Sequence, residues 1–188
     1  MCYIFNDDEE RHQLIAKFIE SGLLGHEKVT YLGSSFADKP VDDVLRRFGV
    51  GPLPEIKAGQ FQALPADDVY CPGHVFLPER MLDRLCKHYS DSIAEGYAGA
   101  RMSGEMEWAL KGIPGSEHLI EYEARINTIH GEHPVTPICQ YDARLFDGAT
   151  LLAVWRVHPM MIIRGQVVRN PYYIPAEEYL KRSLLRPR

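Results

Sequence analysis

The segment 99–110 (GARMSGEMEWAL) contains the residues best suited to recognise a small polar ligand. Arg101 ends a predicted strand, and Glu105 follows four residues later, where a short helix is expected to begin. At the carboxyl edge of a sheet, Arg101 could clamp a carboxylate and Glu105 could accept hydrogen bonds from the ligand. Met106 and Trp108 would add apolar and aromatic walls. A plain Arg101–Glu105 salt bridge with Trp108 in the core explains the same residues equally well.

A second candidate group lies on the predicted helix 116–129. Glu123 and Asn127 are four residues apart and therefore share one helix face. Turned toward a pocket, this pair would form a hydrogen-bonding surface. Turned outward, it would be an ordinary solvated face, and the sequence favours neither alternative.

The segment 139–142 (CQYD) closes a predicted central strand. Alternation along the strand sends Cys139 and Tyr141 to one face and Gln140 and Asp142 to the other. All four are suitable pocket residues at the carboxyl end of a strand. A catalytic Cys139 would require a neighbouring base, for which His158 is a candidate, but an inert buried thiol is the favoured interpretation.

Two residues near the end of the chain complete the set of candidates. His158 closes a predicted helix, where an imidazolium interacts favourably with the helix dipole. Tyr172 belongs to the turn sequence 170–173 (NPYY), which suits either packing at a sheet edge or the rim of a site.

Phosphate-binding and metal-binding motifs are missing from the sequence. The turn 5–11 (FNDDEER), where a phosphate loop would lie, has no glycine or lysine and carries four consecutive carboxylates. Cys71 and His74 have the CxxH spacing of a zinc-ligand pair, but no second pair lies at a suitable distance. We therefore expect neither a metal nor another cofactor.

Hydrophobic periodicity and capping residues predict a chain in which strands alternate with helices. Residues 61–70 look half extended, with Pro65 placing the strand at an edge or ending it early, and Ser116 and Asp147 are the expected N-caps of two helices. Helices are predicted over 8–24, 41–48, 78–96, 106–111, 116–129 and 148–157, with strands over 2–5, 28–33, 99–103, 137–141 and 160–168. This order predicts an α/β fold: a three-layer sandwich with a mainly parallel central sheet of five or six strands. Ligands of such sheets bind beyond the carboxyl ends of the strands.

Composition excludes several classes of protein. The chain has 188 residues and a formal charge of −5, with no run of basic residues, so direct nucleic-acid binding is not expected. Apolar stretches are far shorter than the ~20 residues of a membrane span, and the acidic N-terminus is unlike a signal peptide. We expect a cytoplasmic protein whose four cysteines are reduced.

Several motifs occur in one order that resembles the MEDS family, the methanogen/methylotroph, DcmR-like sensory domains. The matching segments cover about residues 2–179 and are CYIFNDDEE, FIESGLLGHEKVTYLG, LPERMLDRL, GARMSGEMEWAL, YEARIN, ICQYD and HPMMIIRGQVVRNPYYIP. The resemblance implies a sensory domain over 1–180 followed by a basic tail or linker over 181–188. It also implies a fold related to RecA/KaiC-type P-loop ATPases that lacks the phosphate loop.

We therefore predict a non-catalytic input domain that binds a small molecule at the carboxyl edge of the sheet. Arg101 and Glu105 would hold the ligand, and Cys139, Tyr141 and His158 would line the same region. The resemblance implies that the ligand is a simple hydrocarbon derivative, that the output partner is a histidine kinase or a DNA-binding module, and, by analogy, that the chain is a homodimer. One alternative is an enzyme that uses Cys139 with His158, or the carboxylates of Glu105 and Asp142. Another is a protein–protein interaction module derived from a degenerate ATPase.

Overall fold

The computed structural model describes residues 1–33, 41–51 and 57–184. Its strands are β1 (Cys2–Phe5), β2 (Lys28–Leu32), β3 (Phe61–Leu64), β4 (Ala100–Glu105), β5 (Thr136–Asp142), β6 (Met160–Ile163) and β7 (Gln166–Arg169). Its helices are α1 (Asp8–Leu24), α2 (Val41–Arg47), α3 (Ala66–Tyr70), α4 (Pro78–Ala94), α5 (Leu119–Ile129), α6 (Gly148–Val157) and α7 (Ala176–Leu184). Two short 3₁₀ helices, η1 (Glu107–Leu110) and η2 (Ser116–His118), lie between β4 and α5.

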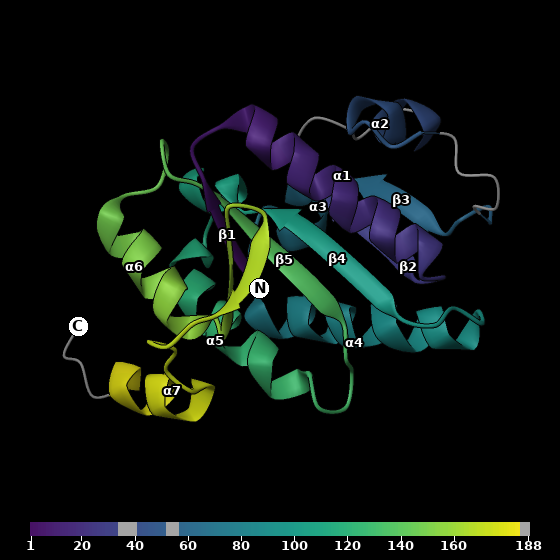
Figure 1. The fold of residues 1–188 in the computed structure, drawn as a ribbon. Helices are drawn as coiled ribbons and strands as arrows, with labels where there is room; N and C mark the ends of the chain where they lie inside the picture. The colour runs from purple at the N-terminus through teal and green to yellow at the C-terminus, as the bar shows by residue number, and fades with distance from the viewer. Residues whose placement is uncertain (34–40, 52–56, 185–188) are drawn as a thin grey trace.

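The seven strands form one sheet in the order β3-β2-β4-β5-β1-β6-β7 (Figure 1). All neighbouring pairs are parallel except β6 and β7, which form an antiparallel hairpin at the edge. α1 packs on one face of the sheet, and α4, α5 and α6 pack on the other. The predicted α/β architecture with a mainly parallel sheet and helices on both faces is therefore confirmed.

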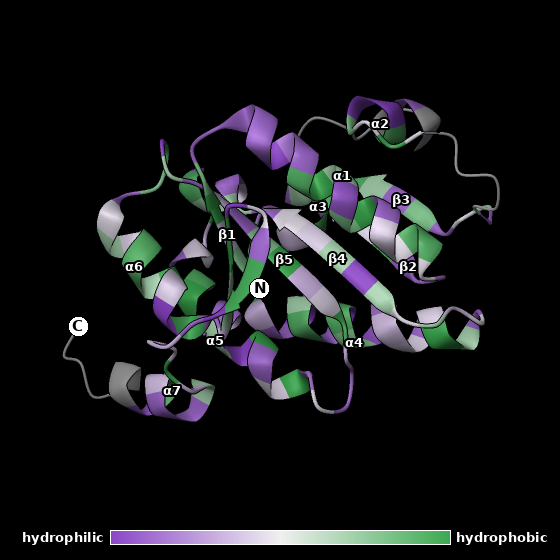
Figure 2. Cartoon of the chain, in the orientation of Figure 1, coloured by the Kyte–Doolittle hydropathy of each residue, from purple (hydrophilic) through white to green (hydrophobic). Residues whose placement is uncertain are grey.

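Each face of the sheet has its own apolar core. Tyr31 and Ile138 pack with the buried side of α1, whereas Met102 and Tyr141 pack with α4 and α5. Figure 2 shows the result: apolar residues lie along the strands and the inner sides of the helices, and polar residues lie outside. Because side chains alternate along a strand, each polar side chain of β4 and β5 points toward one of these two cores.

Local signals placed several boundaries correctly. The Asp7 side chain accepts a hydrogen bond from the Glu10 amide at the start of α1, and Asp147 caps α6 through the amides of Ala149 and Thr150. Both helices therefore begin where the sequence predicts. β3 ends at Leu64, before Pro65, and lies at the sheet edge as expected.

Three local predictions were wrong. Ser116 is not an N-cap, because the chain first forms η2 behind Gly115, which has φ of 90°, and α5 begins only at Leu119. The residues after Pro65 form the helix α3 rather than an extended segment. Finally, β4 continues to Glu105, two residues beyond its predicted end, so Glu105 belongs to the strand and not to a helix.

The last described segment of the chain is helical. α7 runs to Leu184, past residue 180, and packs through Ala176 against Ala124 of α5 and Val157 of α6. Within the described ranges, no helix combines the length and the apolar character needed to cross a bilayer.

A glycine pair in the loop before α5 provides a test of this geometry. A Cβ atom at Gly115 would lie 2.0 Å from the backbone oxygen of Phe76, whereas one at Gly112 would have no atom within 4 Å. Both residues have positive φ, so alanine is strained at each. We expect Gly115→Ala to lower the free energy of unfolding by about 1–3 kcal/mol more than Gly112→Ala, because a backbone atom cannot yield easily. Urea unfolding of the two variants measures this difference, and equal losses would contradict the close approach.

Candidate functional site

A completely buried glutamate lies at the centre of the candidate site. Glu123 is on the side of α5 that faces the sheet, and none of its surface is exposed to solvent. Its neighbours on that side, Tyr122 and Ile126, belong to the apolar core between α5 and the strands. A carboxylate at such a depth requires polar partners that replace water.

Three side chains from different elements contact this carboxylate. The Tyr141 hydroxyl donates to Oε1 at 2.5 Å, and the Cys139 thiol donates to Oε2 at 3.1 Å. Nε2 of His158 lies 3.2 Å from Oε2. Both carboxylate oxygens are therefore satisfied inside the core. We call Glu123, Cys139, Tyr141 and His158 the buried cluster.

The backbone geometry explains why these residues meet. Cys139 and Tyr141 are two apart in β5, so both point toward α5. His158 directly follows α6, and its Nδ1 donates to the carbonyl of Val154 at 2.8 Å, which aims Nε2 at Glu123. Because a carbonyl oxygen can only accept, this bond also fixes which ring nitrogen faces the carboxylate.

Two amides hold the end of α6 in place around His158. Asn127, one turn after Glu123, donates to the carbonyl of Val157 at 2.9 Å and so joins α5 to α6. Asn170, which follows β7, donates to the carbonyls of Trp155 and His158 at 2.7 and 2.9 Å. Asn127 therefore binds the backbone at the end of α6, a role that the sequence analysis did not predict.

The electrostatics of the buried cluster keep the Glu123 carboxyl ionised. Burial by itself would raise the pKa of the Glu123 carboxyl, but the charge of His158 and hydrogen bonds from His158, Tyr141 and Cys139 outweigh it and hold that pKa below its usual value. Burial, followed by the nearby Glu123 charge, raises the pKa values of the Cys139 thiol and the Tyr141 hydroxyl well above normal. The carboxylate is therefore charged, while the thiol and the phenol stay neutral.

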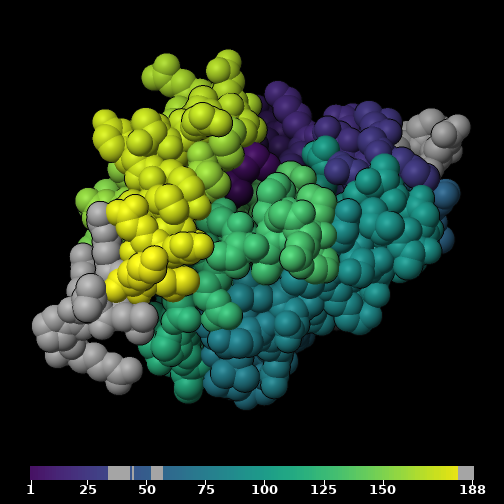
Figure 3. Space-filling view, turned by 90° about the horizontal axis from the view of Figure 1, so that it is seen from below, coloured from purple at the N-terminus to yellow at the C-terminus, as the bar shows by residue number. Residues whose placement is uncertain are grey.

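A pocket of about 180 Å³ lies beside the buried cluster, near the amino end of β5. Its lining includes residues that are close along the chain to the buried cluster. Asn127 is four residues after Glu123, Pro137 is two residues before Cys139, and Pro159 directly follows His158. Figure 3 views the molecule from below and shows the dark purple start of the chain between the yellow-green to yellow C-terminal part and the green segment after α5. The pocket is thus lined by residues close to the buried cluster along the chain, while the four cluster residues themselves do not line it.

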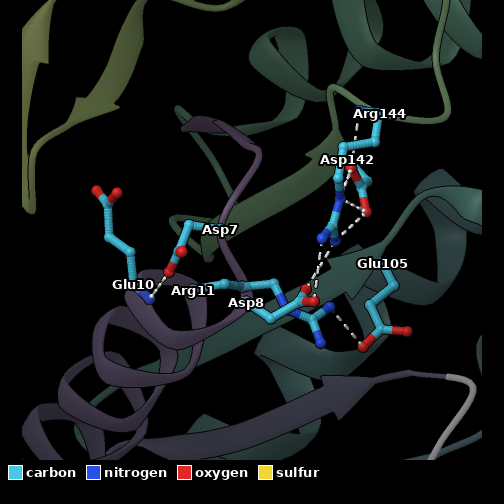
Figure 4. A network of polar contacts seen from close by, with 7 residues as sticks. All are labelled: Asp7, Asp8, Glu10, Arg11, Glu105, Asp142 and Arg144. Atoms are coloured by element: carbon cyan, nitrogen blue, oxygen red, sulfur yellow. Dashed lines mark hydrogen bonds and ion pairs between the residues drawn. The ribbon is translucent and has the colours of Figure 1, made fainter.

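Glu105 and Asp142 lie elsewhere, on the opposite face of the sheet at its carboxyl edge (Figure 4). Glu105 accepts hydrogen bonds from the Tyr31 hydroxyl and from Nη1 of Arg11, the latter at 3.2 Å. Asp142 accepts from the Arg144 guanidinium, which also binds Asp8. The expectation that Cys139, Tyr141 and His158 share one region with Glu105 was therefore wrong, because alternation along β5 separates the two faces.

Arg101 does not meet Glu105 either. The two residues lie at opposite ends of β4, and Arg101 binds the carboxylate of Glu27 and the carbonyl of Phe18. Arg101 lines a separate pocket of about 540 Å³ between α1 and the β6–β7 hairpin. The predicted pairing was wrong because β4 is longer than expected, which places Arg101 at its amino end.

The remaining candidates are not part of the buried cluster. Met106 and Trp108 are fully buried in the core, where Trp108 stacks on Tyr70 with ring centres 5.0 Å apart. Tyr172 is 65% exposed and packs against Trp155. Sequence analysis also missed Arg144 as a partner of Asp142, although a cation two residues after a carboxylate at a strand end was a visible signal.

Removing both members of the Glu123–His158 pair should cost less than the sum of the two single removals. Glu123→Gln takes away the carboxylate that His158 and Tyr141 contact, and His158→Gln takes away one partner of the buried carboxylate, so each should lower the free energy of unfolding by about 3–5 kcal/mol. The double variant should lose less than the sum of the two, with a coupling energy of about 1–3 kcal/mol. Urea unfolding of the four proteins gives this energy, and strict additivity would contradict the pair.

Stability should also depend on pH through Asp142. Hydrogen bonds from Arg144 hold the pKa of Asp142 below its usual value, and the same arginine lowers the pKa of Asp8. This contribution is present above the pKa of an unfolded aspartate, about 3.9, and is lost as pH falls through the lower folded values. Arg144→Gln should thus destabilise the protein at pH 7 and have a smaller effect near pH 3. Arg156→Gln, at an exposed position of α6, serves as the control in melting curves across this range.

Comparison with known proteins agrees with these observations. Residues 1–159 match the family model described as MEDS, the methanogen/methylotroph, DcmR sensory domain. The chain is also 27% identical over 162 residues to the transcriptional repressor DcmR of Methylorubrum extorquens. That match covers 84% of this chain but only 57% of the repressor.

The matched range includes β1 to α6, the complete buried cluster and the first residue beyond it. The motifs recognised in the sequence lie within the same elements, with HPMMIIRGQVVRNPYYIP continuing past the matched range. This chain is therefore a member of the MEDS family of sensory domains.

Proposed function

We propose that the chain is a non-catalytic signal-input domain that binds a simple hydrocarbon derivative and regulates a histidine-kinase or DNA-binding output. Its membership of a sensory-domain family and its similarity to a transcriptional repressor support a regulatory role. The observation that carries the proposal is the juxtaposition of a small pocket with the buried cluster. A ligand in this pocket would contact Asn127, one helical turn after the buried Glu123 carboxylate.

The size and lining of the pocket suit a small, largely apolar molecule. Its volume of about 180 Å³ is close to that of engineered apolar cavities, about 150 Å³, that bind benzene. Ile126, Ile129, Val135 and Pro159 provide apolar surface, and Asn127 provides a polar group. A hydrocarbon carrying one polar or halogen substituent matches this combination.

The elements around the pocket indicate how binding would be transmitted. Ile126 and Asn127 belong to α5, Val135 directly precedes β5, and Met160 begins β6. A ligand between them favours whichever arrangement of α5 and the strands binds it better. The surface formed by α5 and α7, which contact each other, would change with that arrangement.

The enzyme alternative has less support. The Cys139 thiol is 4% exposed, donates to Glu123 and has a raised pKa, whereas a nucleophilic cysteine needs an accessible thiolate. Glu105 and Asp142 are held by Arg11 and Arg144 in ion pairs, which disfavours their use as an acid and a base. A receptor role requires none of these groups to react.

The turn between β1 and α1 also argues against a nucleotide ligand. Asp7, Asp8 and Glu10 lie together at this turn in Figure 4, where a triphosphate would be repelled. The family resemblance implies descent from a RecA/KaiC-type ATPase without its phosphate loop, and this acidic turn agrees with that proposal. Signalling would then depend on a ligand other than ATP.

We further propose that the domain acts as a homodimer in the cytoplasm. Sensory modules that feed dimeric kinases or repressors are commonly dimeric, so one binding event can change an interface between protomers. Native mass spectrometry of freshly purified protein counts protomers and detects a co-purified organic molecule in the same experiment.

Methyl NMR can locate the ligand. In protein labelled at isoleucine and methionine methyl groups, titration with short-chain alcohols and halocarbons should shift the signals of Ile126, Ile129 and Met160. Signals of Ile19, on the other face of the sheet, and of Met106, beyond the carboxyl end of β4, should stay in place. The physical reason is that only the first three residues line the pocket.

A matched pair of substitutions provides the control for this experiment. Val135→Phe fills the pocket and should abolish the shifts, whereas Val167→Phe, beside the 540 Å³ pocket, should leave them unchanged. Shifts that instead appear around the larger pocket and vanish in Val167→Phe would place the ligand near Arg101. No saturable shift with any probe would contradict ligand binding at the buried cluster.

A further inference from the structure

Three side chains of the buried cluster are metal ligands by type. The carboxylate of Glu123, the thiol of Cys139 and the imidazole of His158 each present one ligand atom, and these atoms all lie within 4.8 Å of one another. All three residues are buried. Zinc in proteins is bound by this set of oxygen, sulfur and nitrogen donors.

The distances fit a common centre. With bonds of about 2.0–2.3 Å, ligand atoms around a tetrahedral zinc ion lie roughly 3.3–3.8 Å apart. Oε2 of Glu123 is 3.1 Å from Sγ of Cys139 and 3.2 Å from Nε2 of His158. An ion would therefore need to separate these atoms by only a few tenths of an ångström.

Hydrogen bonds from neighbouring groups orient the three side chains as they do in known metal sites. Nδ1 of His158 donates to the Val154 carbonyl, which leaves Nε2 to coordinate, an arrangement usual for zinc-binding histidines. The Tyr141 hydroxyl holds Oε1 of Glu123 and leaves Oε2 facing the other two ligand atoms. Such hydrogen bonds orient the ligands before any ion arrives.

Charge balance also favours a divalent ion. One carboxylate and one thiolate neutralise a dication, so the occupied site has no net charge to be desolvated in the core. Cys2 is aligned with Cys139 in the neighbouring strand β1 and is buried in the same core. Its thiol is not one of the ligand atoms that all lie within 4.8 Å of one another, so the site proper consists of the three residues.

We infer that Glu123, Cys139 and His158 form a binding site for a zinc-type divalent cation. The sequence predicted no metal site because these residues come from α5, β5 and the end of α6, without the short spacing of a zinc motif. The site does not rest on the proposed organic ligand, because none of its three residues lines the 180 Å³ pocket.

Cobalt substitution tests this assignment on the full chain. Metal-depleted protein titrated with Co²⁺ should bind one ion per chain and develop a thiolate-to-cobalt charge-transfer band with the intense visible bands of tetrahedral coordination. Cys139→Ser should remove the charge-transfer band, and His158→Gln should weaken binding about a hundredfold or more. Cys86→Ser and His130→Gln, on α4 and just beyond α5, should bind like the parent chain.

Variants at the CxxH motif distinguish the other source of ligands. If Cys71→Ser or His74→Gln abolishes the band while Cys139→Ser retains it, the inference is wrong. It is equally wrong if the parent chain binds no stoichiometric Co²⁺. Should Cys139→Ser fail to fold, X-ray absorption at the zinc edge of the parent chain decides, with sulfur at about 2.3 Å beside nitrogen or oxygen expected and a shell without sulfur excluding the site.

The experiments can contradict the metal site and the organic-ligand site independently of each other. Val135→Phe fills the pocket without changing a ligand residue, so it should bind Co²⁺ like the parent chain while losing the methyl shifts. Methyl shifts in the parent chain without cobalt binding would overturn the metal site alone. Cobalt binding without methyl shifts would overturn only the proposed organic ligand.

Discussion

The buried carboxylate of Glu123 is the constraint on which the α5 side of the molecule depends. A charge at zero exposure is tolerated only where partners replace its hydration, and here they come from β5 and from the end of α6. These contacts therefore form only when three features fit together. They are the position of α5 on the sheet, the path of the chain after α6 and the direction of two β5 side chains. Apolar packing alone would allow small shifts of α5, whereas the hydrogen bonds to both carboxylate oxygens do not.

A second polar system stabilises the other face in a different way. Arg11 and Arg144 neutralise Glu105 and Asp142 at the carboxyl ends of β4 and β5. These pairs lie at the edge of the sheet and are partly open to water, so screening weakens them more than the enclosed cluster. The sheet thus separates two sets of polar contacts, the buried cluster on one face and the ion pairs of Glu105 and Asp142 on the other. Of the two, only the buried cluster lies near the small pocket.

Local sequence signals were sufficient where a structure depends on neighbours along the chain. α1 was predicted from its capping Asp7 and its apolar stripe, and the parallel sheet followed from the alternation of strands and helices. The end of β4 was mispredicted because Glu105, a charged residue, was expected to follow the strand rather than to belong to it. It remains in the strand because Arg11, distant in sequence, neutralises it.

The candidate residues were also only partly predictable. Glu123, Cys139, Tyr141 and His158 were each selected from their types and positions, and the structure brings these four together. Their partnership could not be derived, because it depends on the packing of α5 against β5 and on the bond between His158 and Val154. Arg101 and Glu105 illustrate the opposite case, since four residues of strand keep apart two side chains that a helix turn would have joined.

Asn170 has a mechanical consequence for the edge of the sheet. Its amide binds the carbonyls of Trp155 and His158, and its backbone amide binds the carbonyl of Pro159, so the end of the β6–β7 hairpin is fastened to the backbone of the buried histidine. Both ends of the hairpin are therefore tied to the segment around His158, and β6 is also paired with β1. A shift of that segment would have to be shared by β1, β6 and β7 together, while the side chains of Ile163 and Val167 stay exposed to solvent.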